Sequence, residues 1–335
     1  MPGIGIITNA NARIHRMFPF FHRFLKKMVG RRGNLIATLS IDELEKTVRD
    51  FLNQDLDIIA ISGGDGTIHR TLDALLKATD NPSELPMILT LPSGTMNIIP
   101  RALGISGGTV SNLMSTVFSY NHDLPMRVVK RNILQVNGDY SMLFGMGAPV
   151  RILKVNYEQG KSRFGASAMF IKYFSDLVMG AKLFEEILAP FSSSFTFDDD
   201  KPVSIEAHTL FASFTEKLPF GFRFFPLSTK RRGEFETVFL DLTPRQAFST
   251  IPRMWGGNPR EFKGVLRKTA SRLLIENKEP MEYTLDGDIY PAKKEFKIVA
   301  GPELRFIVPP GISYIKPGRK PRTGKTPPWG KYILR

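Results

Sequence analysis

The segment Ser62-Gly63-Gly64-Asp65-Gly66-Thr67 combines residue types that bind phosphate with a single carboxylate. Glycines let the backbone come close to a phosphate and aim N–H groups at it. An apolar run from Asp57 to Ser62 predicts a strand before the segment, and helical periodicity from Thr67 to Ala78 predicts a helix after it, whose N-terminus attracts anions. The spacing matches neither a Walker A loop nor GxGxxG.

The carboxylate of Asp65 is unexpected in a loop that only binds phosphate, because a carboxylate repels phosphate. Its presence indicates a residue that works with Mg²⁺ or receives a proton during phosphoryl transfer. The alternative interpretation is a glycine-rich turn in which Asp65 caps the following helix.

A second polar loop follows the next predicted strand, Met87 to Leu91, and precedes a helical stretch, Ile98 to Gly104. In this loop, Pro92-Ser93-Gly94-Thr95-Met96-Asn97, the side chains of Thr95 and Asn97 can hydrogen bond to a nucleotide phosphate or sugar. Alone, the loop is equally compatible with an ordinary turn. Because the two loops end consecutive strands, we expect them to line one crevice at the carboxyl edge of a parallel sheet.

Strands and helices alternate along the first 125 residues, which predicts a parallel sheet with helices on both faces. Ser40 and Glu43 have the spacing of a capping box. The other expected elements are strands at residues 3–8, 35–39, 57–62 and 87–91, and helices at 18–29, 40–52 and 67–78.

Short strands dominate residues 126–312, with turns at Asn137-Gly138 and Asp286-Gly287, so we expect an antiparallel β domain there. Two helices interrupt it, one near residues 166–179 and one that begins at Thr243 with the spacing of a capping box. We interpret Asp198-Asp199-Asp200 as a hairpin tip rather than a metal site, since runs of charge usually face water.

The chain of 335 residues carries 46 Lys and Arg against 32 Asp and Glu, a net charge of +14. Such a field attracts nucleic acid, nucleotide phosphates or an anionic membrane, without choosing among them. No zinc finger, helix-turn-helix or aromatic RNA-binding strand supports nucleic acid as a partner. The absence of cysteine excludes disulfides and thiolate chemistry, and we expect neither a secretory signal nor a membrane-spanning segment.

Two segments could attach the protein to a membrane. Residues 313–335 hold seven basic residues, no acidic ones and several prolines, which predicts a disordered basic tail. Residues 13–32 interleave basic residues with phenylalanines, as in an interfacial helix, or else direct the phenylalanines at the sheet. Of the two segments, the tail is the stronger candidate.

The motifs GGDGT, PSGTMN with Arg101-Ala-Leu-Gly104, and Asp286-Gly287-Asp288 together resemble the diacylglycerol kinase catalytic-domain family. That family includes bacterial lipid kinases and the sphingosine and ceramide kinases, and its fold is related to those of NAD kinases and phosphofructokinases. The resemblance spans about residues 1–310. It implies an N-terminal α/β domain (1–125), a C-terminal β-sandwich-like domain (126–312) and ATP, bound with Mg²⁺, between them.

The resemblance also implies residue roles. Asp65 would be the indispensable acid, and Asp288 would take the place of the family's proposed general base on the lipid hydroxyl. The nucleotide would be bound by residues of the two loops, of the second strand and of the segment before the first helix of the second domain: Thr38, Gly63, Gly64, Asp65, Gly66, Thr67, Ile68, His69, Gly94, Thr95, Asn97 and Arg163, the last together with Lys161.

The sequence departs from the family pattern at several positions. Asp288 replaces a glutamate, Arg70 stands where a glutamate commonly follows GGDGT, and Ile98 replaces an aspartate. Arg232, in Arg232-Gly-Glu-Phe-Glu236, occupies a ligand position of the structural Mg²⁺ site of bacterial members, so we expect no metal in the second domain. Residues 9–13, which follow the first predicted strand, lack the usual Asn-Pro pattern.

The sequence therefore predicts an ATP-dependent kinase that phosphorylates the primary hydroxyl of a membrane lipid, with diacylglycerol the expected acceptor and sphingoid bases or ceramide the alternatives. The expected partners are this lipid and an anionic membrane surface, and the expected location is the cytoplasm, at the inner face of the membrane. NAD kinase is a weaker alternative, because the second loop and the late Asp-Gly-acid motif differ. A catalytically impaired regulator that binds nucleotide or lipid is the alternative of another class. The sequence predicts no oligomeric state.

Overall fold

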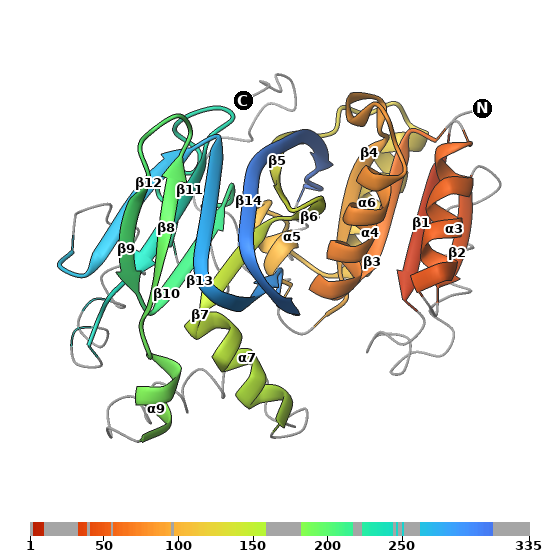
Figure 1. Ribbon diagram of the computed structural model, residues 1–335. Coiled ribbons are helices and arrows are strands. Elements are labelled where there is room, and N and C mark those ends of the chain that lie inside the picture. Colours follow the sequence, from red (N-terminus) through yellow and green to blue (C-terminus); the bar gives the residue numbers. More distant parts are fainter. Residues whose placement is uncertain are drawn as a thin grey trace, which may run out of the picture.

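The computed structural model describes residues 3–9, 33–38, 41–54, 56–94, 97–158, 182–216, 223–243, 246, 250 and 262–310. One continuous sheet runs through them in the order β12-β11-β10-β7-β13-β14-β4-β3-β1-β2. Its parallel end carries the helices of the first half of the chain, and its antiparallel end forms the β-rich second half (Figure 1). The mixed α/β fold expected from the sequence is confirmed.

The parallel end has the strands that the sequence predicts and the helices predicted at residues 40–52 and 67–78. Its strands pair in the order β4-β3-β1-β2, so β3 and β4 are neighbours with their carboxyl ends at the same edge. The helix α4 begins at Asp65, two residues earlier than expected. The elements are β1 Ile4–Asn9, β2 Gly33–Thr38, α3 Ile41–Leu52, β3 Ile58–Gly63, α4 Asp65–Lys77, the 3₁₀ turn η2 Pro82–Glu84, β4 Met87–Pro92, α5 Ile98–Ala102 and α6 Thr109–Asn121.

Alternating side chains of the parallel strands face two separate cores. On one face Ile59 and Ile61 pack against α3 and α4, and on the other Ile58 and Ala60 pack against α6. Strands buried on both faces read as continuous apolar runs, which is why the pattern predicts a parallel sheet covered by helices.

The second half is antiparallel, and the turns at Asn137-Gly138 and Asp286-Gly287 have the positive φ angles expected of two-residue hairpin turns. Asp198 lies in the turn from β8 to β9, as predicted. The elements are β5 Val128–Val136, β6 Asp139–Ser141, β7 Leu143–Gly147, α7 Ala148–Glu158, α9 Lys182–Ile187, β8 Phe191–Phe197, β9 Val203–Ala207, β10 Thr209–Ser213, β11 Phe235–Leu240, β12 Val265–Ala270, β13 Arg272–Leu285 and β14 Asp288–Ile307.

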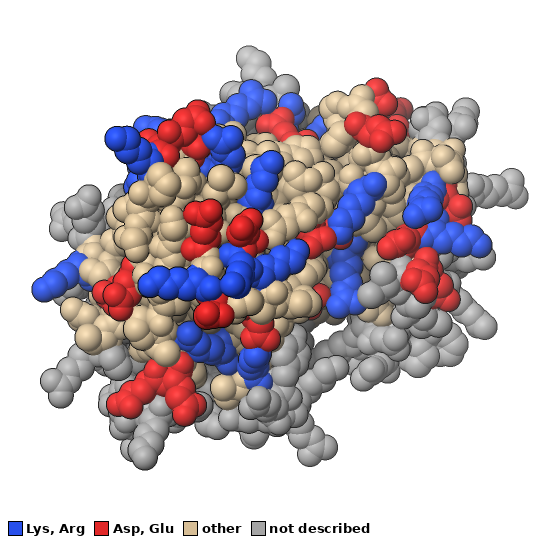
Figure 2. Space-filling view, viewed as in Figure 1, with Lys and Arg blue, Asp and Glu red and all other residues tan. Residues whose placement is uncertain are grey.

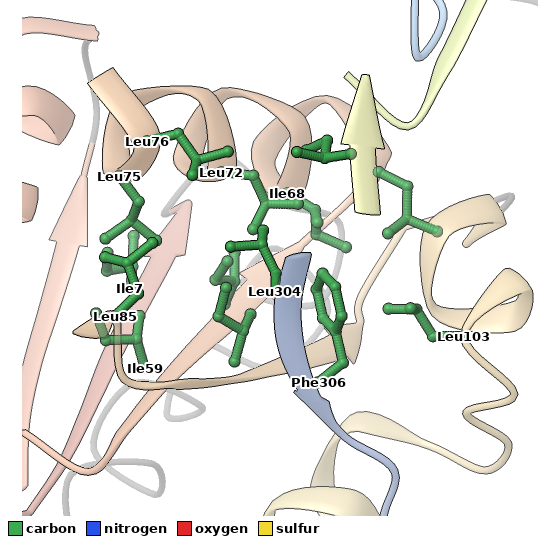
Figure 3. Close-up of a cluster of buried hydrophobic side chains, with 14 of the residues drawn as sticks. Ile7, Ile59, Ile68, Leu72, Leu75, Leu76, Leu85, Leu103, Leu304 and Phe306 are labelled. Atoms are coloured by element: carbon green, nitrogen blue, oxygen red, sulfur yellow. The ribbon is translucent and has the colours of Figure 1, made fainter. Parts of the chain in front are cut away.

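The long strand β14 belongs to both halves. It pairs with β13 and β5 in the antiparallel part and meets β4 in parallel at Phe306 and Ile88. Leu304 and Phe306 lie among the leucines of α4, as Figure 3 shows. The division at residue 125 stays a prediction, but one hydrophobic core crosses that position.

Several sequence predictions lie outside the described residues. These are the helices at 18–29 and 166–179, and the tail from residue 313. The capping contacts predicted for the helix that begins at Thr243 are present, since the Thr243 N–H donates to Gln246 Oε1 over 2.9 Å. None of the described helices is long and apolar enough to cross a membrane.

A buried ion pair ties two strands of the β-rich half together. Arg267 Nη1 lies 2.9 Å from Glu236 Oε1, and both side chains are buried. The other carboxylate oxygen accepts the N–H groups of Leu227 and Ser228. Removing one partner of a buried pair leaves an uncompensated charge, whereas exposed pairs contribute little.

We therefore expect Arg267→Met to lower the free energy of unfolding by about 3–5 kcal/mol. Urea unfolding measures this change. The matched control is Arg231→Met, which breaks the exposed pair with Glu234 and should cost less than about 1 kcal/mol. The double change Arg267→Met/Glu236→Gln should recover most of the loss. Equal effects of the two single changes would contradict this interpretation.

Candidate active site

The two glycine loops meet at the carboxyl edge of the parallel sheet. Ser62 Oγ and Ser93 Oγ are 3.0 Å apart, and the N–H of Ser93 donates to the carbonyl of Gly63 over 3.1 Å. A Cβ added at Gly94 would lie 2.6 Å from the Cα of Gly64, so the backbones are nearly in contact. The two loops therefore lie side by side, and a crevice between them stays a prediction.

The first loop passes directly into the first turn of α4. A Cβ at Gly63 would lie 2.4 Å from the Cβ of Thr67, which explains the need for glycine there. Thr67 Oγ1 also accepts a hydrogen bond from Asn9 Nδ2 at the end of β1, over 3.3 Å. The N–H of Thr67 donates to the carbonyl of Gly64 over 3.0 Å, and the helix start as a whole carries partial positive charge that attracts an anion. We call residues 63–67 the cradle.

Asp65 begins α4 and reaches across to the second loop. Its Oδ1 accepts the N–H of Ile99, at the start of α5, over 3.0 Å. Burial raises the pKa of Asp65 and the charge of Asp286 adds to the rise, although the N–H groups of Ile99 and Ile98 oppose it. The only acid of the cradle is thus a partly desolvated carboxylate held between both glycine loops.

A buried network links α4 to the turn between β13 and β14. His69 Nδ1 lies 2.9 Å from Asp286 Oδ2, and His69 Nε2 lies 3.0 Å from the hydroxyl of Tyr290. The carboxylate of Asp286 also accepts the N–H groups of Met142 and Leu143. Burial opposes protonation of His69, but the hydrogen bond and charge of Asp286, with the charges of Asp288 and Asp73, raise its pKa overall.

Asp288 stands at the start of β14, two residues beyond Asp286. A Cβ added at Gly66 would lie 3.8 and 3.9 Å from its two carboxylate oxygens, so Asp288 faces the cradle. Arg70 donates to Asp288 Oδ2 through Nε and Nη2, each over 3.2 Å. Arg70 and Asp288 both depart from the family pattern and lie 218 residues apart, and in the structure they form one ion pair.

A groove of about 610 Å³ opens beside this pair, between α3, α4, β6 and the start of β14. Arg70 and Asp288 line one part of it. Lys77 lines it too and forms ion pairs with Asp73 over 2.8 Å and with Asp139 over 2.6 Å. The size suits a small-molecule ligand, and the charged lining suits a polar group rather than an acyl chain.

The structure brings together the predicted site residues of the cradle, Gly94, Asn97 and Asp288. Asn97 holds its own loop, because its amide accepts the N–H of Gly94 and donates to the Gly94 carbonyl. The side chain of Ile68 is in the core and that of His69 is buried behind the cradle, so neither ring nor alkyl group faces a ligand. Thr38 ends β2, beside Asn9. Thr95, Lys161 and Arg163 lie outside the described residues.

Sequence reasoning missed the roles of Asp286 and Tyr290 and the partner of Asp288. The Asp-Gly turn was the available signal for Asp286, but it predicts a hairpin and not a histidine 217 residues away. At the position of the accessory metal site, Arg232 contacts Glu303 over 3.3 Å, and Lys130 contacts the same carboxylate over 3.2 Å. Among the described residues, no group of three or more His, Asp or Glu side chains is arranged to hold a metal ion.

The comparisons with known proteins agree with this geometry. Residues 5–129 match the family model of the diacylglycerol kinase catalytic domain. The chain is 23% identical over 266 residues to the diacylglycerol kinase of Bacillus subtilis (strain 168), covering 78% of this chain and 81% of that protein. Crystal structures of a diacylglycerol kinase and of a related protein from Bacillus anthracis str. Sterne, each 18% identical, superpose with TM-scores of 0.62 and 0.67 and cover 92% of this chain and 97% of theirs. The resemblance expected from the motifs is confirmed.

The contact between the glycine loops gives a structural prediction. Gly94→Ala should separate the loops, because the added methyl would overlap backbone rather than a movable side chain. We expect a loss of about 1–3 kcal/mol, the usual cost of overpacking, measured by urea unfolding. Gly108→Ala is the control, since its new methyl would have only Ser111 Oγ nearby, at 3.9 Å. A Gly94→Ala protein as stable as this control would mean that the loops do not pack as described.

Proposed function

We infer that this chain, a lipid kinase of the diacylglycerol kinase family, transfers the terminal phosphoryl group of ATP to the primary hydroxyl of a membrane lipid, with diacylglycerol the expected acceptor. One observation carries the proposal: carboxylates from opposite ends of the chain, Asp65 and Asp288, face a single glycine cradle. A phosphate in that cradle would lie between them, and the acceptor hydroxyl would approach past Asp288.

The residues present fit a nucleotide bound with Mg²⁺. Beside Gly64 and Gly66 an added Cβ would have no atom closer than 3.6 Å, which leaves space for a phosphate, and the start of α4 supplies positive potential. Carboxylates are the ligands that Mg²⁺ prefers. Burial disfavours the charged form of the Asp65 carboxylate, and a nearby cation would stabilise that form. Bound Mg²⁺ would neutralise charge on the phosphates during transfer.

Asp288 is the candidate general base. A carboxylate beside the terminal phosphate can accept the proton of an attacking hydroxyl, directly or through a water molecule. Aspartate is one methylene shorter than the family's glutamate. In this chain Asp288 sits at the start of β14, where the Asp286 network fixes the backbone of the turn. The neighbouring groove would take the polar part of a substrate.

A membrane surface is the proposed partner, since the acceptor is a lipid. Residues 10–32 and 316–335 each contain seven Lys or Arg and no Asp or Glu. The remaining 32 basic residues balance all 32 acidic ones, so these two segments account for the whole net charge of +14. On the face shown in Figure 2, basic and acidic side chains are interspersed. Attraction to anionic lipid would therefore act through the two segments.

The second candidate is a catalytically impaired protein that binds nucleotide or lipid. The Arg70–Asp288 ion pair favours it, because the pair engages the carboxylate that should act as base. Turnover of Mg-ATP with mixed lipid micelles separates the two functions, since only the kinase would form phosphorylated lipid.

Asp65→Asn should lower lipid phosphorylation at least about 100-fold, because the change removes the charge of the only cradle carboxylate. The amide oxygen of asparagine can still accept the N–H of Ile99, so the fold should persist. Initial rates with labelled ATP measure the effect, and circular dichroism checks the fold. Near-normal activity in a folded Asp65→Asn protein would refute the assignment.

Deleting residues 316–335 should impair only the binding and phosphorylation of lipid in a membrane, because the described strands and helices all end before residue 311. We expect unchanged phosphorylation of a soluble short-chain lipid, and weaker binding and slower phosphorylation of vesicles that contain anionic lipid. The defect should shrink as salt rises, since screening acts over a Debye length of about 8–10 Å. Loss of activity on the soluble lipid would instead assign the segment to the fold or the active site.

A further inference from the structure

Arg70 lies on the same face of α4 as Gly66 of the cradle. It follows Gly66 by four residues, so the two positions are neighbours one helical turn apart. Side chains on a helix lean toward its N-terminus, which directs Arg70 at the cradle. Its partner Asp288 faces Gly66, as the distances of 3.8 and 3.9 Å show. The guanidinium therefore lies at the edge of the cradle, bound to the carboxylate that faces Gly66.

The charges around the cradle call for a cation there. Asp65 lies in the cradle and Asp288 faces Gly66, whereas Asp286 is paired with His69. Among the described residues of the two glycine loops, 62–67 and 92–97 without 95 and 96, there is no Lys or Arg. Such a site repels a triphosphate unless positive charge is brought in.

Arg70 is free to supply that charge, whereas Lys77 is not. The side chain of Arg70 is 50% exposed, and its one ion pair with the part of the chain that the structure describes is with Asp288, whose side chain is 30% exposed. Lys77 is held by Asp73 and Asp139 together. An exposed ion pair contributes only about 0–1 kcal/mol to the stability of the fold. Arg70 can therefore leave Asp288 for a phosphate at little cost.

We propose that Arg70 binds the terminal phosphate of the nucleotide, pairing with Asp288 when the site is empty and turning its guanidinium to the phosphate when ATP is bound. Arginine suits this role because its planar donors match phosphate oxygens and because it stabilises charge that develops during transfer. The same movement frees Asp288 to act as base. The proposal rests on the proposed kinase function and deepens it.

Calorimetric binding of Mg-ATP and Mg-ADP to Arg70→Gln tests the proposal. Only ATP has the terminal phosphate, so ATP affinity should fall about 10- to 100-fold, the usual weight of a hydrogen bond to a charged group, with ADP affinity changed less than about twofold. Arg70→Lys should recover part of the ATP affinity. Asp288→Asn should bind ATP at least as tightly as the unaltered protein, because Arg70 is then released, while its turnover falls.

The matched control is Arg231→Gln, which removes an exposed arginine paired with Glu234 in the β-rich half, outside the groove. It should leave both affinities unchanged. Equal weakening of ATP and ADP by Arg70→Gln, or no weakening of either, would overturn the role of Arg70 while leaving the kinase function standing. Failure of the unaltered protein to bind Mg-ATP would instead overturn the kinase function itself.

Discussion

The buried contact between Asp286 and His69 is the constraint on which the site depends. A buried carboxylate must have its hydrogen bonds satisfied, and Asp286 obtains them from the ring of His69 and from two backbone N–H groups at the start of β7. These three partners belong to α4 and to the β-rich half. By satisfying one carboxylate, the protein fastens the β13–β14 turn to the helix that starts at the cradle, and so sets Asp288 beside Gly66.

Much of the fold was predictable because its signals are local. The apolar runs that form β1, β3 and β4 predict a parallel sheet, and the glycines after β3 and β4 predict ligand loops at one edge. The structure has these strands within one or two residues of the predicted bounds. The Asp-Gly turn at residue 286 was likewise predictable from its two residue types. The partners of Asp286 and Asp288 were not, because they lie more than 140 residues away and depend on tertiary packing. Asp65 was identified from the chemistry of its glycine loop and Asp288 only through the family pattern, whereas Tyr290 carried no signal at all.

Arg70 and Asp288 show why departures from a family pattern are better judged in pairs. Taken singly, an arginine in place of a common glutamate and a shortened acid each suggest damage to the site. In space the two changes are complementary, since they put opposite charges 3.2 Å apart at the edge of the cradle. Aspartate keeps the negative charge of glutamate, so it is the arginine, in place of a glutamate, that turns two neighbouring acids into an ion pair.

The shared strand β14 has a consequence for how the protein is made. Leu304, Phe306 and Val308 complete the core beneath α4, yet they leave the ribosome about 180 residues after the first 129. At about 5–20 residues per second, translation takes roughly 10–35 s to supply them. During that interval the parallel sheet and its helices exist with one side of their core open to water. The stretch that matches the catalytic-domain family therefore cannot complete its core until β14 has been made.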